Sequence, residues 1–191
     1  MTRDAAATQV TGSGAPGVTD GAWLRSLVRE IPDYPHAGVT FRDITPLLAD
    51  PVGFRRCIDD LADRFADVEV DCVVGVESRG FILAAPIAYR LGAAFVPVRK
   101  AGKLPWAVVR EEYELEYGRD KLEIHRDAIH PDERVLVIDD VLATGGTAAA
   151  TARLIEALGG DIVGIGLLIE IVGLGGRAAF ADRRLEVLAS Y

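Results

Sequence analysis

One segment carries most of the information in this chain: Val135-Leu-Val-Ile-Asp139-Asp140-Val-Leu-Ala143-Thr144-Gly145-Gly146-Thr147. An apolar run that ends in two acids is typical of a buried parallel strand, whose carboxyl end lies where α/β folds bind ligands. The glycines let the backbone turn tightly, so the N–H groups of Thr144–Thr147 converge at a helix N-terminus and form an anion-binding nest. The hydroxyl groups of Thr144 and Thr147 add donors. The segment therefore predicts a phosphate cradle close to two carboxylates that suit sugar hydroxyls.

Apolar strands and amphipathic helices alternate on both sides of this segment. We expect strands at Cys72–Val76, Ala94–Val98, Val135–Ile138 and Ile162–Ile171. We expect helices at Trp23–Ile31, Pro51–Phe65, Phe81–Leu91 and Thr147–Leu158, and a loop at Asp33–Asp43. Strands that are continuous apolar runs separated by helices indicate an α/β fold with a central, mainly parallel sheet flanked by helices.

The chain divides into a tail and one domain. Residues 1–20 have no apolar periodicity and predict a flexible N-terminal tail, and residues 21–191 predict a single domain. The tail contains a formal GxGxxG at Gly12, Gly14 and Gly17, but no strand precedes it, so it is not a dinucleotide site. Residues of about 100–127 are charged and contain turn residues, which favours a flexible flap over an active site; a solvated hairpin is the alternative.

Composition excludes several classes of protein. The net charge of −8 argues against nucleic-acid binding, and no apolar run reaches the length of a membrane span. Cys57 and Cys72 have no metal or redox spacing, so we expect buried thiols in a cytoplasmic protein. The histidines show no ligand spacing and are expected to be solvated or capping residues; they are His36, His125 and His130.

The glycine-rich turn is neither a Walker A loop, because no lysine follows it, nor a Rossmann fingerprint. An ordinary strand-to-helix turn would explain its glycines but not Asp139 and Asp140. A phosphate next to a ribose has the shape of a 5-phosphoribosyl group, and the segment resembles the phosphoribosyl diphosphate (PRPP) signature of the type I phosphoribosyltransferases. A second glycine cluster, at Gly173, Gly175 and Gly176, has no acids beside it, and a turn is enough to explain it.

Other segments resemble the same family in a consistent order, over roughly residues 31–177. Val73–Phe81 resembles the loop that receives the pyrophosphate arm, and Val96–Pro105 resembles the next basic segment. Glu112–Gly118 resembles the flap, and Gly38–Ile44 the base-covering loop, of the members that act on adenine. Two departures, at His36-Ala37 and at Ala101, remove no residue to which we assign chemistry.

The resemblance implies a role for each candidate residue. Asp139 and Asp140 would hold the ribose hydroxyls, and the 5-phosphate would bind at Ala143, Thr144, Gly145, Gly146 and Thr147. Arg79 and Lys103 would contact pyrophosphate. Thr40, Phe41 and Arg42 would contact adenine, although a lone phenylalanine is also an ordinary core residue. Glu116 would be the acid or base at the purine ring; otherwise it is a solvated charge in an acidic run.

The resemblance also implies an activity and its partners. We expect adenine and PRPP to give AMP and pyrophosphate, in purine salvage. Mg²⁺ would be bound mainly through PRPP and water, with no protein ligand assigned, and the chain would form a homodimer. Two alternatives remain: a phosphoribosyltransferase specific for another purine, and a non-catalytic PRPP-sensing regulator built on the same fold.

Overall fold

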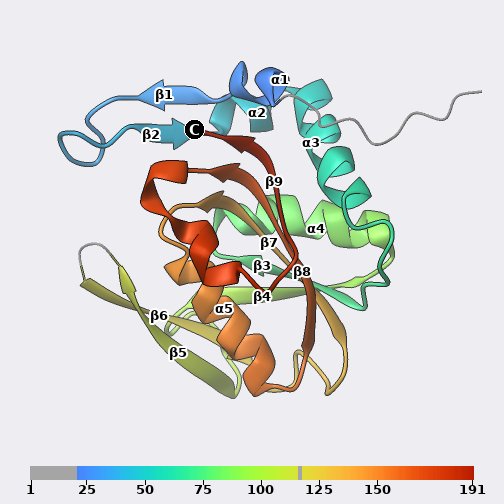
Figure 1. The fold of residues 1–191 in the computed structure, drawn as a ribbon. Helices are drawn as coiled ribbons and strands as arrows, with labels where there is room; N and C mark the ends of the chain where they lie inside the picture. The colour runs from blue at the N-terminus through green and yellow to red at the C-terminus, as the bar shows by residue number, and fades with distance from the viewer. Residues whose placement is uncertain (1–20, 116–117) are drawn as a thin grey trace, which may run out of the picture.

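The computed structural model describes residues 21–115 and 118–191, which contain a central seven-stranded sheet (Figure 1). The strand order is β5-β6-β4-β3-β7-β8-β9. Five strands are parallel: β3 Cys72–Val76, β4 Ala94–Lys100, β7 Arg134–Leu142, β8 Asp161–Glu170 and β9 Leu185–Ser190. The α/β fold class and the mainly parallel sheet expected from the sequence are confirmed.

Helices cover both faces of the sheet. On one face lie α3, Pro51–Asp63, and α4, Arg79–Leu91; on the other lies α5, Gly146–Ala157 (Figure 1). The Asp50 carboxylate accepts from two backbone N–H groups at the start of α3, which caps this helix. All three helices agree with the expected ones to within about two residues. Helix α4 begins at Arg79 rather than at Phe81, so this arginine stands at a helix start. In the part of the chain described here, no helix is both long and apolar enough to span a membrane.

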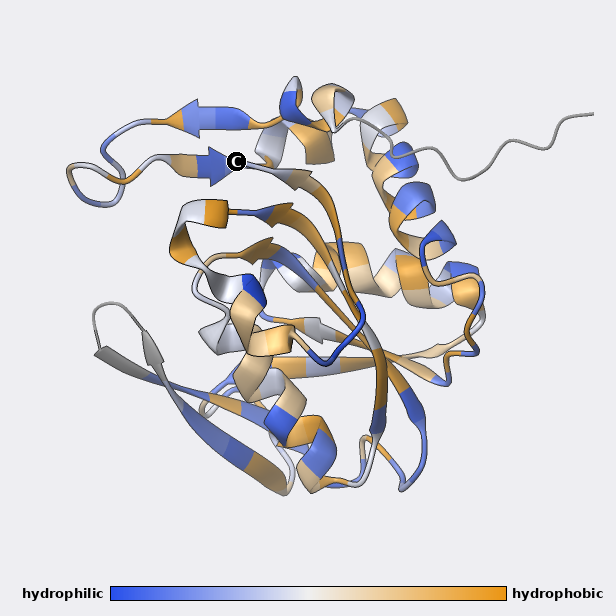
Figure 2. Ribbon diagram, viewed as in Figure 1, coloured by the Kyte–Doolittle hydropathy of each residue, from blue (hydrophilic) through white to orange (hydrophobic). Residues whose placement is uncertain are grey.

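The apolar residues of β7 divide between two cores. Leu136 and Ile138 pack with α3 and α4, whereas Val135 and Val137 pack with α5. This alternation is the period of two expected of a strand that is covered on both faces. Figure 2 shows the apolar residues concentrated along the central strands. The two cores hold the carboxyl ends of β3 and β7 at one edge of the sheet.

The N-terminal region differs from the expectation. The helix expected at Trp23–Ile31 is limited to α1, Ala22–Arg25, and Arg29–Ile31 forms strand β1. This strand pairs antiparallel with β2, Phe41–Asp43, which was expected to be loop. The helical spacing reflected burial of Leu24 and Val28, but pairing with β2 sets the backbone that follows. A short unexpected helix, α2, Thr45–Ala49, comes next.

The charged segment after β4 is a β-hairpin. Strand β5, Val108–Leu115, pairs with β6, Gly118–His125, and β6 joins β4 through the pairs Arg99–Glu123 and Lys100–Leu122. Tyr113, Leu122 and Ile124 are buried in the core that contains α5. One face of the hairpin is therefore packed, so it is not merely a solvated excursion.

The end of the chain also holds elements that were not expected. After β8 come two 3₁₀ helices, η1, Val172–Leu174, and η2, Gly176–Phe180, and then β9. The cluster of glycines expected to form a turn lies in and between η1 and η2. β9 adds a parallel edge strand beside β8, and its sequence is only partly buried, which is why no continuous apolar run marks it.

Candidate active site

A cavity of about 790 Å³ opens at the carboxyl ends of the parallel strands. It is bounded by the segment before β2, the β3–α4 turn, the β7–α5 loop and the hairpin. Its lining includes Thr40, Phe41, Arg42, Glu77, Ser78, Arg79, Lys100, Tyr113, Asp120, Asp139, Asp140 and Ala143–Thr147. The structure thus brings together most of the candidate residues from three distant parts of the sequence.

The β7–α5 loop forms one wall of this cavity. Gly145 has φ of +84°, a left-handed conformation that favours glycine, and helix α5 begins at the next residue. In the described part of the chain, no side chain caps the N-terminus of α5, so its first N–H groups have no side-chain acceptor at the cap. All five residues of Ala143–Thr147 line the cavity. The loop has the geometry of an anion site at a helix N-terminus.

The two acids lie within β7 rather than beyond its end. Asp139 and Asp140 are 8% and 6% exposed, and the Asp140 N–H donates to Asp139 Oδ1 at 2.9 Å. Burial raises the pKa of Asp139 well above its ordinary value, and the charge of Asp140 adds to this effect. Burial also raises the pKa of Asp140, although Arg79 opposes it. The pair is held in the cavity against a cost of desolvation.

Arg79 connects the acids to the N-terminal region. Its Nε lies 2.7 Å from Asp140 Oδ2, and its guanidinium carbon lies 5.2 Å from the centroid of the Phe41 ring. Tyr34 packs edge-on against the same ring, with centroids 5.4 Å apart. Because α4 starts at Arg79, the guanidinium lies beside both the carboxylate pair and the loop expected to cover a base.

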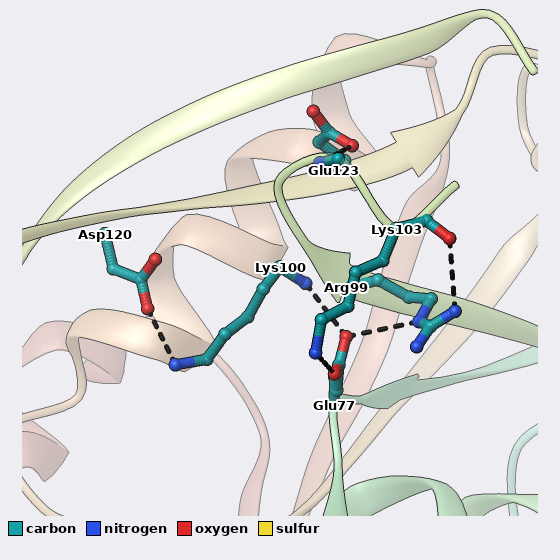
Figure 3. Close-up of polar contacts among 7 residues, drawn as sticks. Glu77, Arg99, Lys100, Lys103, Asp120 and Glu123 are labelled. Carbon is teal, nitrogen blue, oxygen red and sulfur yellow. Dashed lines mark hydrogen bonds and ion pairs between the residues drawn. The ribbon is translucent and has the colours of Figure 1, made fainter. Parts of the chain in front are cut away.

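The basic segment at the end of β4 is organised by one carboxylate (Figure 3). Glu77 Oε2 accepts from Arg99 Nε and from the Lys100 N–H, each at 3.1 Å, and Glu77 pairs with Lys103. Burial opposes ionisation of Glu77, but these donors outweigh it and lower its pKa. Lys103 therefore faces Glu77 and is not among the residues that line the cavity.

Lys100, from the basic segment at the end of β4, lines the cavity together with two hairpin residues to which the sequence had assigned no role, Tyr113 and Asp120. Lys100 Nζ lies 3.0 Å from Asp120 Oδ2, and the Tyr113 hydroxyl interacts with the side chains of Asp120 and Thr147. Burial raises the pKa of Tyr113. These contacts connect the hairpin to the start of α5, next to the β7–α5 loop. In the sequence, the weak alternation of apolar and polar residues in this segment was the signal that could have indicated Tyr113.

The three residues expected to contact adenine all line the cavity, but Arg42 is also engaged outside it. Thr40 and Phe41 contribute to it, as does Arg42, but the guanidinium of Arg42 lies 4.3 Å from the centroid of the Tyr191 ring and pairs with Glu30. His36, expected to be solvated or capping, also lines the cavity. Glu116 lies outside the described residues.

The geometry agrees with the comparisons with known proteins. Residues 45–180 match the model of the phosphoribosyl transferase domain, which is more than half of the chain. The chain belongs to the phosphoribosyltransferase family, as the strand, acid pair and glycine-rich loop of the site indicate.

The relatives narrow this class. The adenine phosphoribosyltransferase of Acaryochloris marina is 56% identical over 168 residues, which cover 88% of this chain and 99% of that protein. The crystal structure of the Rhodothermus marinus adenine phosphoribosyltransferase is 48% identical with a TM-score of 0.86, covering 92% of this chain and all of that one. The Saccharomyces cerevisiae enzyme, solved with adenine and an imino-altritol bisphosphate, is 37% identical with a TM-score of 0.83, covering 88% and 97%. Within its class, the chain falls among the adenine phosphoribosyltransferases.

Proposed function

We propose that this chain transfers the 5-phosphoribosyl group of PRPP to adenine, with AMP and pyrophosphate as products. The observation that carries this function is the convergence of the anion loop, the acid pair and Arg79 on one cavity. The activity is that of its relatives at about 55% identity over most of the chain. It places the chain among the pentosyltransferases, in purine salvage.

Two parts of the cavity would hold the phosphoribosyl group. Ala143–Thr147 would bind the 5-phosphate through backbone N–H groups and the threonine hydroxyls. Asp139 and Asp140 lie next to this loop in the chain and would accept hydrogen bonds from the ribose hydroxyls. The ribose would then lie between the strand end and the helix N-terminus, with its anomeric carbon facing the rest of the cavity.

The reaction exchanges one bond at the anomeric carbon. The bond to the pyrophosphate oxygen breaks, its electron pair leaves with pyrophosphate, and N9 of adenine forms the new bond on the opposite face of the sugar. Because the ribosyl centre becomes cationic while the leaving group gains charge, cations near pyrophosphate stabilise the transition state. Arg79 would serve this role, and Lys103 would join it after exchanging Glu77 for pyrophosphate.

Adenine would bind at Thr40, Phe41 and Arg42. The guanidinium carbon of Arg79 lies 5.2 Å from the centroid of the Phe41 ring, so an adenine at this wall would lie close to the leaving group. Glu116 would handle the N9 proton that adenine loses. The hairpin that carries Glu116 would exclude water, which otherwise hydrolyses PRPP.

We propose Mg²⁺ as the cofactor, bound mainly by PRPP oxygens and water. Carboxylate oxygens are the protein groups that Mg²⁺ prefers, and Asp139 and Asp140 supply such oxygens in the same cavity. When bound, the ion would neutralise charge on the pyrophosphate group. The acids themselves orient the ribose.

We further propose a cytoplasmic homodimer. Its support is an exposed apolar stripe on α4, formed by Ile82, Ala85 and Tyr89, with Phe95 of β4 also exposed. Tyr89 is 91% exposed, an unusual state for an aromatic side chain on a helix that also bears a buried face. The free thiols of Cys57 and Cys72 fit a reducing compartment.

The test supplies PRPP and Mg²⁺ together with adenine, hypoxanthine or guanine and follows nucleotide formation. We expect AMP from adenine and little product from the other two bases. Turnover of guanine or hypoxanthine without adenine would indicate another purine specificity. Binding of PRPP with no nucleotide formed from any base would indicate a PRPP-sensing regulator instead.

A further inference from the structure

The second glycine cluster lies directly against the phosphate loop. In the segment 172–180, which comprises η1, Gly175 and η2, Gly176 is buried while its neighbours Gly175 and Arg177 are exposed. A Cβ atom on Gly176 would lie 2.3 Å from the Ala143 carbonyl oxygen and 2.9 Å from the Gly145 nitrogen. These are backbone atoms, so no side chain can rotate away to make room.

The contact is reciprocal. A Cβ atom on Gly145 would lie 2.8 Å from the Gly176 carbonyl oxygen, and Gly145 is the left-handed residue of the phosphate loop. Two glycines therefore face each other so that two backbones can approach closely. The position of one backbone sets the position of the other, since interiors packed at this density do not yield freely.

The segment is itself anchored at two points. Arg177 donates to Glu170 at the end of β8 through Nε at 3.0 Å and Nη2 at 2.7 Å, and Glu170 is buried. Phe180 is 4% exposed in the core of α5, and its ring would lie 3.3 Å from a Cβ on Gly145. The anchors fix the segment relative to β8 and to α5, the helix into which the phosphate loop leads.

We propose that Gly176 is a positioning residue for the 5-phosphate, which sets the direction of the Thr144–Thr147 N–H groups from behind the loop. The proposal rests on the assignment of Ala143–Thr147 to the 5-phosphate. Backbone donors bind an anion only where they converge on it, so a displacement of the loop by a few tenths of an ångström misaligns them. A side chain at position 176 would force such a displacement.

The experiment compares two alanine variants of the same segment. Gly176→Ala meets the loop, whereas Gly173→Ala meets nothing within 4 Å and is the matched control. Binding is measured for two probes. Ribose 5-phosphate carries the 5-phosphate that we assign to the loop, whereas pyrophosphate with Mg²⁺ is assigned to other groups. We expect Gly176→Ala to weaken the binding of ribose 5-phosphate about ten-fold or more, as for a misplaced hydrogen bond to a charged group. The binding of pyrophosphate should not change. Gly173→Ala should resemble the wild type for both.

A second variant keeps the test decisive if Gly176→Ala does not fold. Arg177→Lys adds no atoms near the loop but removes the two-pronged anchor to Glu170. It should weaken the binding of ribose 5-phosphate but not of pyrophosphate, and by a smaller factor than Gly176→Ala does. The proposal would be overturned if both variants bound ribose 5-phosphate as tightly as the wild type. It would also be overturned if they lost affinity for ribose 5-phosphate and pyrophosphate equally. Failure of the proposed function has a different signature, because the wild type itself would then bind no ribose 5-phosphate or form no AMP.

Discussion

Asp139 and Asp140 are adjacent acids in a central strand, and both are more than nine-tenths buried. Among the described residues, one salt bridge, from Arg79 to Asp140, serves the two carboxylates. The folded protein therefore holds charge that water would solvate better. Residues retained at such a cost are commonly functional. The structure assigns the cost mainly to Asp139, because the salt bridge reaches Asp140.

Asp139→Asn is expected to stabilise the fold while it reduces activity. Folding raises the pKa of Asp139, so the folded state holds this proton more tightly than the unfolded chain does. Stability is therefore lost as the pH rises from the ordinary aspartate value through the raised pKa. The neutral amide is spared this loss, and its oxygen can still accept from the Asp140 N–H.

The measurement is urea unfolding of the wild type and Asp139→Asn at about pH 5 and about pH 8. The stability advantage of the variant should grow toward the higher pH. Asp182→Asn, at an exposed position, is the control for the change in net charge. An advantage that is absent, or equal at both pH values, would contradict the origin assigned here.

At the scale of elements, the hairpin β5–β6 includes the position of Glu116, the residue that we propose as the acid or base at the purine ring. Tyr113 and Asp120 connect the packed face of this hairpin to Thr147 and Lys100. Side chains of the hairpin thus contact the segment that we propose to bind the 5-phosphate. Glu112 and Lys121 pair with each other in the same two strands and do not line the cavity.

Glu116→Ala is expected to lower kcat by about 100-fold or more, the usual contribution of general acid–base catalysis. The KM for PRPP should stay within about three-fold of the wild type, because Glu116 is assigned to the base and not to the phosphates. Glu112→Ala, in the same acidic run, is the matched control and should retain most activity. Steady-state kinetics with adenine and PRPP varied in turn measure both constants; an unchanged kcat would return Glu116 to the solvated face of the hairpin.

The elements differ in how well sequence predicts them, for physical reasons. β3, β7 and α5 were predicted because strands and helices buried on a fixed face need periodic apolar residues. β1, β2 and β9 were not, since they are short, only partly buried and stabilised by pairing with distant segments. The glycine-rich loop and the acid pair were predicted from one segment, whereas the places of Tyr113, Asp120 and Gly176 depend on contacts between segments that no local pattern records.

Over the whole molecule, the net charge of −8 is compatible with an anionic ligand, because the groups that would bind the anion are local to the cavity. Its cations are paired with carboxylates. Arg79 pairs with Asp140, Lys100 with Asp120, and Arg42 with Glu30. A phosphate group must exchange with these carboxylates to reach the cations, while the phosphate loop uses N–H groups that bear no formal charge. Net charge thus excludes a long basic surface but not a small phosphorylated substrate.

The exposed stripe on α4 leads to a prediction about assembly. We expect the wild type to have twice the mass of one chain in solution, and Tyr89→Glu to reduce it to a single chain by placing a charge in the centre of the interface. Val52→Glu is the control: it places the same charge on an exposed apolar residue of a different helix, α3, and should leave the mass unchanged. Light scattering coupled to size-exclusion chromatography measures all three; a wild type with the mass of one chain would refute the homodimer.

The double coverage of β7 has a consequence for how the molecule comes apart. A domain with two separate cores can open in two stages, each with its own stability. Here Leu136 and Ile138 belong to one core and Val135 and Val137 to the other, so neither core can dissolve without loosening the strand that completes its neighbour. The same strand carries Asp139 and Asp140 at its end. We therefore expect unfolding to be cooperative across the sheet, with the site formed by Asp139 and Asp140 lost in the same transition as both cores.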